Sequence, residues 1–192
     1  MERFQNIEYL KKGNLKQKIS YKILTEINIF KILQNYKPFL VGTIPLEIDI
    51  EKSDLDIVCE ISEKTEDEFK NIIFHSFSKY KNFNIKDDFL KNRVIVINFV
   101  VDGIEIEIFA SKEKSIKTNG YRHMIIEFRI LKLADKKFKR KIIELKKLGI
   151  KTEPAFAQLL KLKGDSYDAL LEYEKLKDEE IKEILDKWSY IN

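Results

Sequence analysis

Cysteine, proline and glycine are scarce in this chain of 192 residues, which has 1 Cys, 3 Pro and 6 Gly. The single cysteine, Cys59, excludes an intrachain disulfide, and its place in an apolar run predicts a small buried residue. The sequence also lacks internal repeats and low-complexity segments. These absences exclude a disulfide-stapled scaffold and a repeat architecture.

Long apolar runs and a strong excess of one charge are missing as well. No stretch is long enough to span a bilayer, and the first residues lack the apolar segment of a signal peptide. We therefore expect no membrane partner and a cytoplasmic location. The net charge of +4 and the pI of about 8.9 allow a nucleic-acid partner but give only weak support for one.

The chain contains enough apolar sequence for a real core, with 44% hydrophobic residues. Its length suits a single domain over residues 1–192. Within it we expect an α/β core with an N-terminal helix over residues 1–115 and a helical region over residues 116–192. The periodicity predicts helices over 15–35, 65–79, 121–134, 136–148, 154–161, 166–176 and 178–188.

Three further segments read as extended. Phe39-Leu40-Val41 is a short apolar strand, and residues 54–61 form the next one. Between them, residues 46–51 alternate apolar and acidic side chains, which suggests an extended segment with one wet face. Thr65 followed by Glu68 fits a capping box at the start of the helix over 65–79.

A β-hairpin is the clearest local prediction. Asp102-Gly103 joins two alternating runs and is typical of a two-residue type I′ turn. In that register Asn98 lies opposite Glu107, and one face of the hairpin is wholly apolar. A slip of one residue would bring Glu105 and Glu107 into the core, so the register should be well determined.

Two aspartates one residue apart are the main chemical signal. Asp54 and Asp56 fall on one face of a strand, about 7 Å apart at Cα. Their repulsion would be relieved by a hard divalent cation, because Mg²⁺ prefers oxygen ligands. Upstream of Asp54, with ten residues between, Gly42-Thr43 offers a close backbone approach, a hydroxyl and an amide donor for a phosphate.

A third acid, either Glu105 or Glu107, can converge with the aspartate pair. Two such charges about 5 Å apart repel by about 3 kcal/mol at an effective dielectric constant of about 20. A pair of metal ions held there would suit an in-line phosphoryl displacement. The alternative is that the two glutamates form the solvated face of an edge hairpin.

One predicted helix carries a second set of candidates. Arg122 and Arg129 are seven residues apart, hence on one face, and guanidinium groups suit bidentate contact with phosphate. The alternative is a surface helix paired to Glu127 or to the acids of the sheet. His123 is either a base for an acceptor hydroxyl or a hydrogen-bonding helix residue.

The spacing of these motifs resembles the signature of the nucleotidyltransferase superfamily, which has the polymerase-beta-like fold. The chain further resembles domain-of-unknown-function family 4269, a group of small nucleotidyltransferase-like proteins. The matching stretches cover most of the chain: Val41-Gly42-Thr43-Ile44-Pro45, Ser53-Asp54-Leu55-Asp56-Ile57, Glu105-Ile106-Glu107-Ile108-Phe109, Tyr121-Arg122-His123-Met124 and Lys151-Thr152-Glu153-Pro154-Ala155-Phe156-Ala157.

The resemblance implies a mixed sheet flanked by helices and Mg²⁺- or Mn²⁺-dependent transfer of a nucleotidyl group from a nucleoside triphosphate. It implies metal ligation by Asp54 and Asp56, with Glu107 as the preferred third acid and Glu105 still a candidate. Candidate nucleotide-binding residues are Gly42, Thr43, Ser53, Arg122, His123 and Arg129. The acceptor could be a small molecule, a protein or an RNA end.

A second hypothesis is a catalytically inactive module that keeps the fold and binds a nucleotide or another partner. The acidic segment between Ile44 and Lys52 motivates it, because Glu47, Asp49 and Glu51 replace the Gly and Arg that active members often carry there. Nucleotide turnover separates the two hypotheses. A third, RNA binding, rests on the pI alone and predicts steep salt dependence.

Overall fold

The turn at Asp102-Gly103 forms as predicted and organises the central hairpin. Both residues have positive φ, 49° and 80°, as a type I′ turn requires. Strands β4 (Val94–Val101) and β5 (Ile104–Ser111) pair antiparallel on either side of it, with Asn98 opposite Glu107. The predicted register is therefore confirmed.

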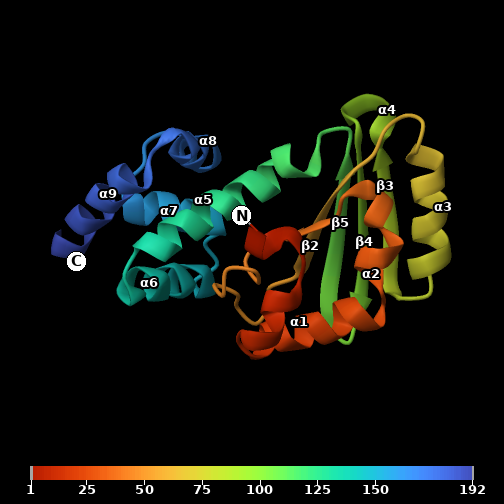
Figure 1. Ribbon diagram of the computed structural model, residues 1–192, viewed down its shortest axis with the longest axis horizontal. Coiled ribbons are helices and arrows are strands. Elements are labelled where there is room, and N and C mark those ends of the chain that lie inside the picture. Colours follow the sequence, from red (N-terminus) through yellow and green to blue (C-terminus); the bar gives the residue numbers. More distant parts are fainter. Residues whose placement is uncertain (1, 192) are drawn as a thin grey trace. The chain divides into compact units, whose positions relative to one another are not determined.

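The computed structural model describes residues 2–191, with side chains up to residue 188. Within that range five strands form one mixed sheet in the order β1-β2-β5-β4-β3 (Figure 1). The remaining strands are β1 (Phe39–Val41), β2 (Leu55–Glu60) and β3 (Lys81–Asp88). Neighbouring strands run antiparallel except β2 and β5, which are parallel. The predicted mixed sheet is confirmed.

Two compact units divide the chain. The first comprises the residues up to Glu47 together with Ser53–Tyr121, and it contains the whole sheet. The second comprises Ile48–Lys52 and the residues from Arg122 onward, and it is helical. In the second unit the ammonium group of Lys146 donates to the carbonyl oxygen of Ile48 at 2.8 Å, which ties the short segment to the helices.

One face of the sheet is apolar and carries the core of the first unit. Helices α1 (Leu15–Glu26), α2 (Ile29–Ile32) and α3 (Glu66–Phe77) contribute buried side chains to this core together with the strands (Figure 1). The Phe77 ring stacks on the Phe99 ring at 5.0 Å between centroids. Buried residues of the strands include Leu55, Ile57, Ile95, Ile97, Phe99, Ile106 and Ile108. The alternation predicted for the hairpin is thus confirmed.

The predicted helix over residues 15–35 is interrupted, so that prediction is wrong in its middle. Asn28 takes a left-handed conformation with φ of 55°, which ends α1 and starts α2. Asparagine tolerates this conformation better than most residues. A 3₁₀ turn, Gln34–Tyr36, follows. The chain can thereby change direction while apolar residues from both helices still reach the core.

Two other local predictions are corrected. Thr65 makes no capping hydrogen bond to α3; its hydroxyl group accepts from the amide of Ser62 at 2.9 Å instead. Residues 46–51 form turns and irregular backbone rather than an extended segment, and Glu47 has φ of 57°. Leu46 and Ile48 are nevertheless buried, so their apolar character reflects packing in a loop.

Strand β3 was not anticipated. It forms the edge of the sheet beside β4, with a register shift between Lys81 and Asn84. Its sequence is polar and its side chains are exposed or partly buried. The sequence therefore lacks the alternation of apolar and polar residues that predicts a strand. Edge strands commonly carry such charged residues, which discourage pairing with other chains.

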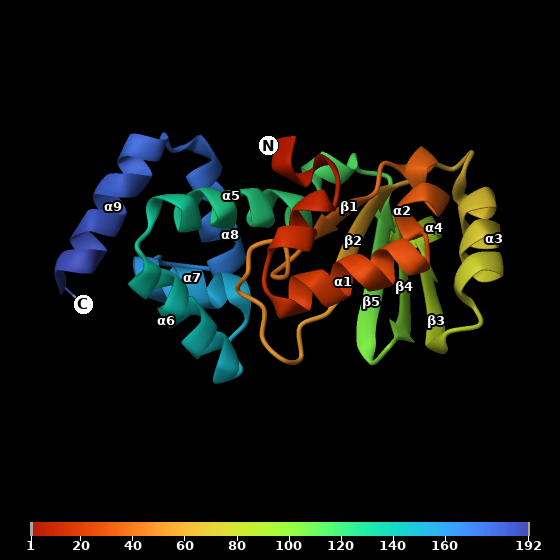
Figure 2. The same ribbon diagram turned by 60° about the horizontal axis from the view of Figure 1, so that its bottom comes forward.

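The second unit is built from helices that largely follow the prediction (Figure 2). Gly149, with φ of 89°, lies two residues beyond the end of α6 (Lys136–Lys147). The predicted helix over 166–176 is divided into an α-helix and a 3₁₀ helix. The bounds are α5 (Asn119–Leu133, whose first residues belong to the first unit), α6 (Lys136–Lys147), α7 (Thr152–Leu160), α8 (Ser166–Leu171), a 3₁₀ helix Glu172–Lys175, and α9 (Asp178–Ile191).

Short helices complete the description. They are 3₁₀ helices at Glu2–Gln5, Glu8–Lys12 and Ser115–Lys117, and α4 (Phe89–Asn92). Among the described helices, none combines the length and the apolar character of a membrane span.

Replacing Gly103 by alanine should destabilise the first unit by about 1–2 kcal/mol, because a side chain is strained at this positive φ. Urea unfolding measures the loss. Gly120→Ala is the control: its added Cβ meets side-chain atoms only at 3.6 Å or more and its φ lies outside the left-handed region. Equal losses in both variants would contradict a special role for the turn.

Candidate functional site

The parallel pairing of β2 with β5 places two of the predicted acids side by side. Asp56 and Glu107 are partners in the register of these strands, and neighbouring strands lie about 4.8 Å apart. In-register neighbours point to the same face. That face is the one opposite the apolar core, and both side chains are partly buried. We call the set Asp54, Asp56, Glu105 and Glu107 the acid group.

Gly42 lies directly against this group. It follows β1 with φ of +79°, a conformation that favours glycine. A Cβ added at Gly42 would lie 2.3 Å from Oδ2 of Asp56. The glycine therefore serves two purposes: it allows the bend after β1, and it leaves space for the carboxylate. The structure thus brings Gly42 and Asp56 together, as the motif spacing predicted.

The loop residues next to Gly42 are linked to those before β2. The hydroxyl group of Thr43 donates to the hydroxyl oxygen of Ser53 at 3.2 Å. Ser53 precedes Asp54, which in turn directly precedes β2, and all three residues are partly buried. The two ends of the ten-residue interval are therefore joined, and the predicted residues of this motif lie in one neighbourhood.

Asn98 is a residue of this face that sequence reasoning did not single out. Its amide nitrogen donates to Oε2 of Glu107 at 3.2 Å and reaches Oε1 of Glu105 at 3.4 Å. The amide thus bridges the two candidate third acids. Glu105 is exposed, whereas Glu107 is partly buried and opposite Asp56. The hairpin register predicted that Asn98 faces Glu107, which was the available signal.

A second unanticipated residue fixes the loop after Gly42. Gln17 of α1 is fully buried, and its side-chain amide donates to the carbonyl oxygen of Ile44 at 2.8 Å. Its Oε1 accepts from the amide of Asn14, which caps α1 in return. The start of α1 is therefore bound to the loop. The spacing of Asn14 and Gln17 is the sequence signature of a capping box, but no local signal predicts the contact of Gln17 with Ile44, because that contact spans 27 residues.

Among the residues that the structure describes, no group of three or more His, Cys, Asp or Glu side chains is arranged to hold a metal ion. The acid group nevertheless supplies oxygen atoms only, the ligand type that Mg²⁺ prefers. Cys59, two residues beyond Ile57 on β2, is fully buried as predicted, and burial raises the pKa of its thiol.

The three candidates on α5 belong to the second unit and have partners there. Arg122 donates to both carboxylate oxygens of Glu174, at 3.0 and 2.7 Å. Arg129 donates to Asp178 and to the carbonyl oxygens of residues 173 and 176. The alternative, in which the arginines of this helix pair with acids, is thus observed. Their partners lie in the C-terminal segment and are neither Glu127 nor the acids of the sheet. Phosphate binding by these arginines stays a prediction.

His123 is buried, with 4% of its surface exposed. Its Nε2 lies 3.0 Å from the carbonyl oxygen of Tyr167, so Nε2–H donates. Its Nδ1 lies 3.6 Å from the carboxylate of Glu153. His123 therefore makes the hydrogen bond of a structural helix residue, and a role as a base stays a prediction.

A buried carboxyl group lies on the same helix. Glu127 is 2% exposed, and its Oε1 has no hydrogen-bond partner. Burial raises the pKa of Glu127 well above its ordinary value; the charge of Glu153 raises it further and that of Lys146 lowers it. The folded protein therefore favours the protonated form of this side chain.

Comparison with known proteins identifies the family of this chain. The family described as "Domain of unknown function (DUF4269)" matches residues 22–173. The chain belongs to the DUF4269 family. No curated protein matches it.

Solved structures show which fold this DUF4269 chain has. The RNA terminal uridylyl transferase Cid1 aligns at 12% identity with a TM-score of 0.56, over 85% of this chain and 52% of that chain. A cytoplasmic RNA terminal U-transferase aligns at 11% identity with a TM-score of 0.53, over 85% and 50%. The fold is that of polymerase-beta-like nucleotidyltransferases, as the motifs predicted. This chain spans about half the length of these relatives.

Replacing Gly42 by alanine should displace the Asp56 carboxylate as well as strain the backbone. We expect a loss of about 1–3 kcal/mol in the free energy of unfolding from the conformation alone, with a further loss from the 2.3 Å contact. Urea unfolding measures the total. Gly103→Ala is the matched control, because Gly103 has φ of +80° and nothing within 4 Å of an added Cβ. Equal losses would contradict the close packing of Gly42 against Asp56.

Replacing Glu127 by glutamine should change how stability depends on pH. Because the folded-state pKa is raised, the stability that Glu127 contributes is complete below its unfolded pKa, about 4.3, and is lost as the pH rises through the folded-state value. Glutamine does not titrate. The variant should therefore gain stability relative to the parent in the window that opens at about pH 4 and extends upward.

Urea unfolding at several pH values in this window measures that difference. Glu113→Gln, at an exposed position, is the control and should show a constant difference. Parallel pH profiles for the parent and Glu127→Gln would contradict the raised pKa.

Proposed function

We propose that this DUF4269 protein is a Mg²⁺-dependent nucleotidyltransferase that transfers a nucleotidyl group from a nucleoside triphosphate to an acceptor hydroxyl. The observation that carries the proposal is the placement of Asp56 beside Glu107 on parallel strands, directly against Gly42. The polymerase-beta-like fold supports it.

Asp54 and Asp56 are the residues that would hold Mg²⁺ or Mn²⁺, with Glu107 completing the ligand set. The donor chemistry fits, because all the candidate ligands are carboxylate oxygens. When bound, such an ion would offset the charge of the carboxylates and of the triphosphate. Glu105 is the remaining candidate ligand. Because Glu105 is exposed and Glu107 is partly buried, we prefer Glu107 as the third metal ligand.

Glu107 would also accept the proton of the attacking hydroxyl group. Asn98 donates to Oε2 of Glu107, which orients the carboxylate and leaves Oε1 for the proton. The hydroxyl oxygen would then form a bond to the α-phosphorus as the bond to the leaving pyrophosphate breaks. Gly42 and Thr43 would seat the phosphates through their backbone amides, and the hydroxyl group of Thr43, which donates to Ser53, would hold this loop in place.

Asp56→Asn should reduce turnover by about 100-fold or more, on the scale of losing an essential catalytic group. The assay incubates each of the four ribonucleoside triphosphates with Mg²⁺ or Mn²⁺ and measures released pyrophosphate. Glu113→Gln, at an exposed position two residues beyond the end of β5, is the control and should keep full turnover. Turnover by Asp56→Asn equal to that of the parent would contradict the proposed mechanism.

Thermal unfolding separates the metal site from the chemistry. A cation that binds only the folded protein raises its melting temperature, so Mg²⁺ should stabilise the parent and leave Asp56→Asn unchanged. Without metal the variant should melt no lower than the parent, because a carboxylate repulsion of up to about 3 kcal/mol is relieved. A variant that melts far below the parent would point to a structural role for Asp56.

A nucleotide-binding module without catalysis is the second candidate. The loop after Gly42 favours it, because Glu47, Asp49 and Glu51 place negative charge within ten residues of the phosphate-seating motif. One of these, Glu47, lies 3.8 Å from the guanidinium group of Arg3, which reduces its effect. Thermal stabilisation by a triphosphate with Mg²⁺, without any pyrophosphate release, would favour this candidate over the enzyme.

A further inference from the structure

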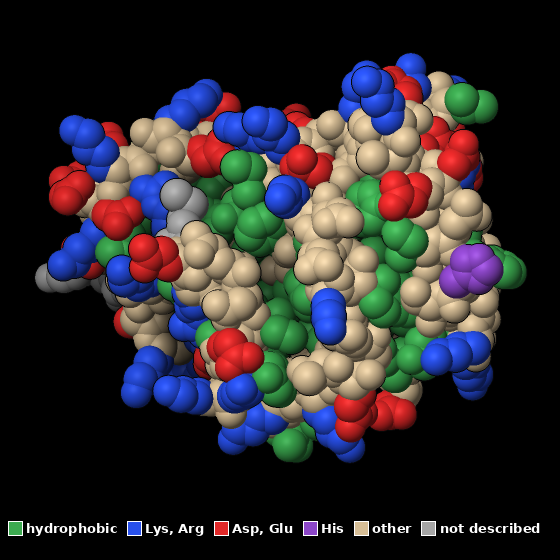
Figure 3. Space-filling model, turned by 45° about the vertical axis from the view of Figure 1, so that its right-hand side comes forward, with side chains coloured by type: hydrophobic (Ala, Val, Ile, Leu, Met, Phe, Trp, Pro, Cys, Tyr) green, Lys and Arg blue, Asp and Glu red, His purple; other side chains and the backbone are tan. Residues whose placement is uncertain are grey.

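Positive charge is concentrated in one part of the chain. Residues 132–163 contain 11 Lys and Arg against 3 Asp and Glu, whereas the remaining residues contain 25 against 29. The net charge of +4 therefore conceals a strongly basic segment within an otherwise slightly acidic chain. On the face that Figure 3 shows, charges of both signs occur over much of the surface, which is the usual appearance of a mixed composition.

The three acids of this segment are already used within the second unit. Asp135 caps α6 by accepting from the amide of Phe138 at 2.8 Å. Glu144 pairs with Lys141 at 2.9 Å. Glu153 faces His123. Within the segment, positive side chains exceed negative ones by eight, from 11 Lys and Arg against 3 Asp and Glu.

Helix α6 presents this charge to solvent in an ordered way. Its opposite face is buried: Phe138 packs against the rings of Phe156 and Trp188 at 5.9 and 5.0 Å. Three side chains on the other side are exposed. At about 3.6 residues per turn they fall within about 40° of one another, and they extend over about 16 Å of helix. We call this set the basic stripe; it consists of Lys136, Arg140 and Lys147.

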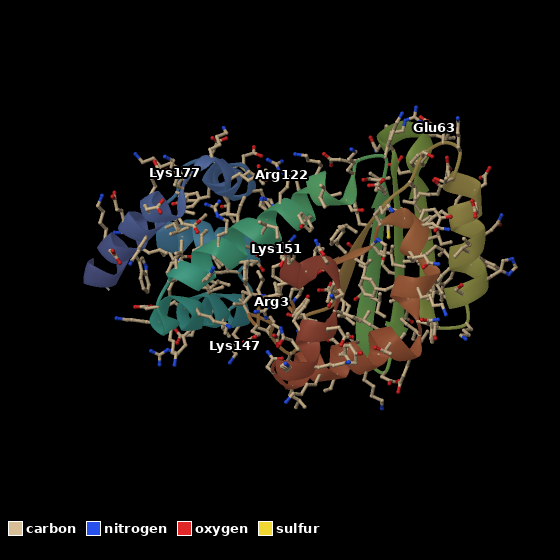
Figure 4. All side chains as sticks on the ribbon, viewed as in Figure 1. Arg3, Glu63, Arg122, Lys147, Lys151 and Lys177 are labelled. Carbon is tan, nitrogen blue, oxygen red and sulfur yellow. The ribbon has the colours of Figure 1, made fainter. Side chains whose placement is uncertain are left out.

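Basic residues continue along the sequence beyond the helix. Lys147 closes α6 and the exposed Lys151 precedes α7 (Figure 4). No acid stands between these two lysines in the sequence. The segment thus offers a run of cations to an extended polyanion, rather than a single pocket to a small anion.

We propose that the basic stripe binds the phosphate backbone of a nucleic-acid strand. Charge complementarity selects a polyanion. A membrane surface is disfavoured because interfacial helices insert an apolar face, and the apolar face of α6 is packed inside the second unit. If the proposed nucleotidyl transfer holds, the bound strand carries the acceptor hydroxyl; that part rests on the proposed function, whereas binding does not.

Fluorescence anisotropy of the full chain with a labelled 20-nucleotide oligouridylate, and with oligothymidylate, tests the proposal. Three phosphate contacts contribute a slope of about −2 to the plot of log affinity against log salt. The variant Lys136→Gln/Arg140→Gln/Lys147→Gln should lose this slope and bind about 100-fold more weakly at about 0.1 M salt. Its urea unfolding curve should match that of the parent, because all three side chains are exposed.

The matched control removes the same charge elsewhere. Lys18, Lys31 and Lys91 are exposed residues of the first unit, and their triple replacement by glutamine should leave the affinity within about twofold. Equal weakening in both triple variants would overturn the proposal, since net charge alone would then explain binding. So would binding that is insensitive to salt, or binding only to vesicles containing phosphatidylserine.

Asp56→Asn separates this proposal from the proposed function. It should bind the oligonucleotide with parental affinity while losing turnover. If the parent shows no turnover but the stripe variant loses binding, the result supports the nucleic-acid surface and contradicts the proposed enzyme activity. If turnover on another acceptor is found and the stripe variant binds like the parent, the surface falls and the activity stands.

Discussion

The parallel pairing of β2 with β5 is the constraint on which the candidate site depends. It sets Asp56 next to Glu107 on a sheet whose other face is a continuous apolar core. A shift of one residue in either strand would turn its carboxylate into that core, where a charged group without a partner is very costly. The burial of the apolar face therefore holds the acids in position, and no contact among the acids is needed to do so.

Local signals in the sequence were sufficient for the hairpin that carries one of these acids. Two residues at Asp102-Gly103, flanked by alternating runs, specify the turn and hence the register. The same register places Asn98 opposite Glu107, and the structure adds the hydrogen bond between them. Spacing alone does not specify a long-range contact. That Gly42 and Asp54 lie near each other was predicted because the interval between them matches a known family signature.

Other features had no local signal. The polar edge strand β3 is specified by its neighbour β4 and not by its own pattern. Gln17 reaches the loop after Gly42 from 27 residues away, and Arg122 meets Glu174 across 52 residues. Such polar contacts depend on how helices are placed by packing, which periodicity does not report. The break at Asn28 was missed because the apolar spacing continues through it.

The distribution of charge links the two proposals physically. An acid group that faces phosphates repels them unless cations are supplied, so affinity for a polyanionic acceptor has to arise elsewhere in the chain. In our proposal the basic segment of residues 132–163 would provide that attraction, since its acids form a helix cap and ion pairs. Attraction through exposed lysine and arginine is screened by salt, whereas the placement of Asp56 and Glu107 by strand pairing is not. Binding and chemistry should therefore respond to salt independently.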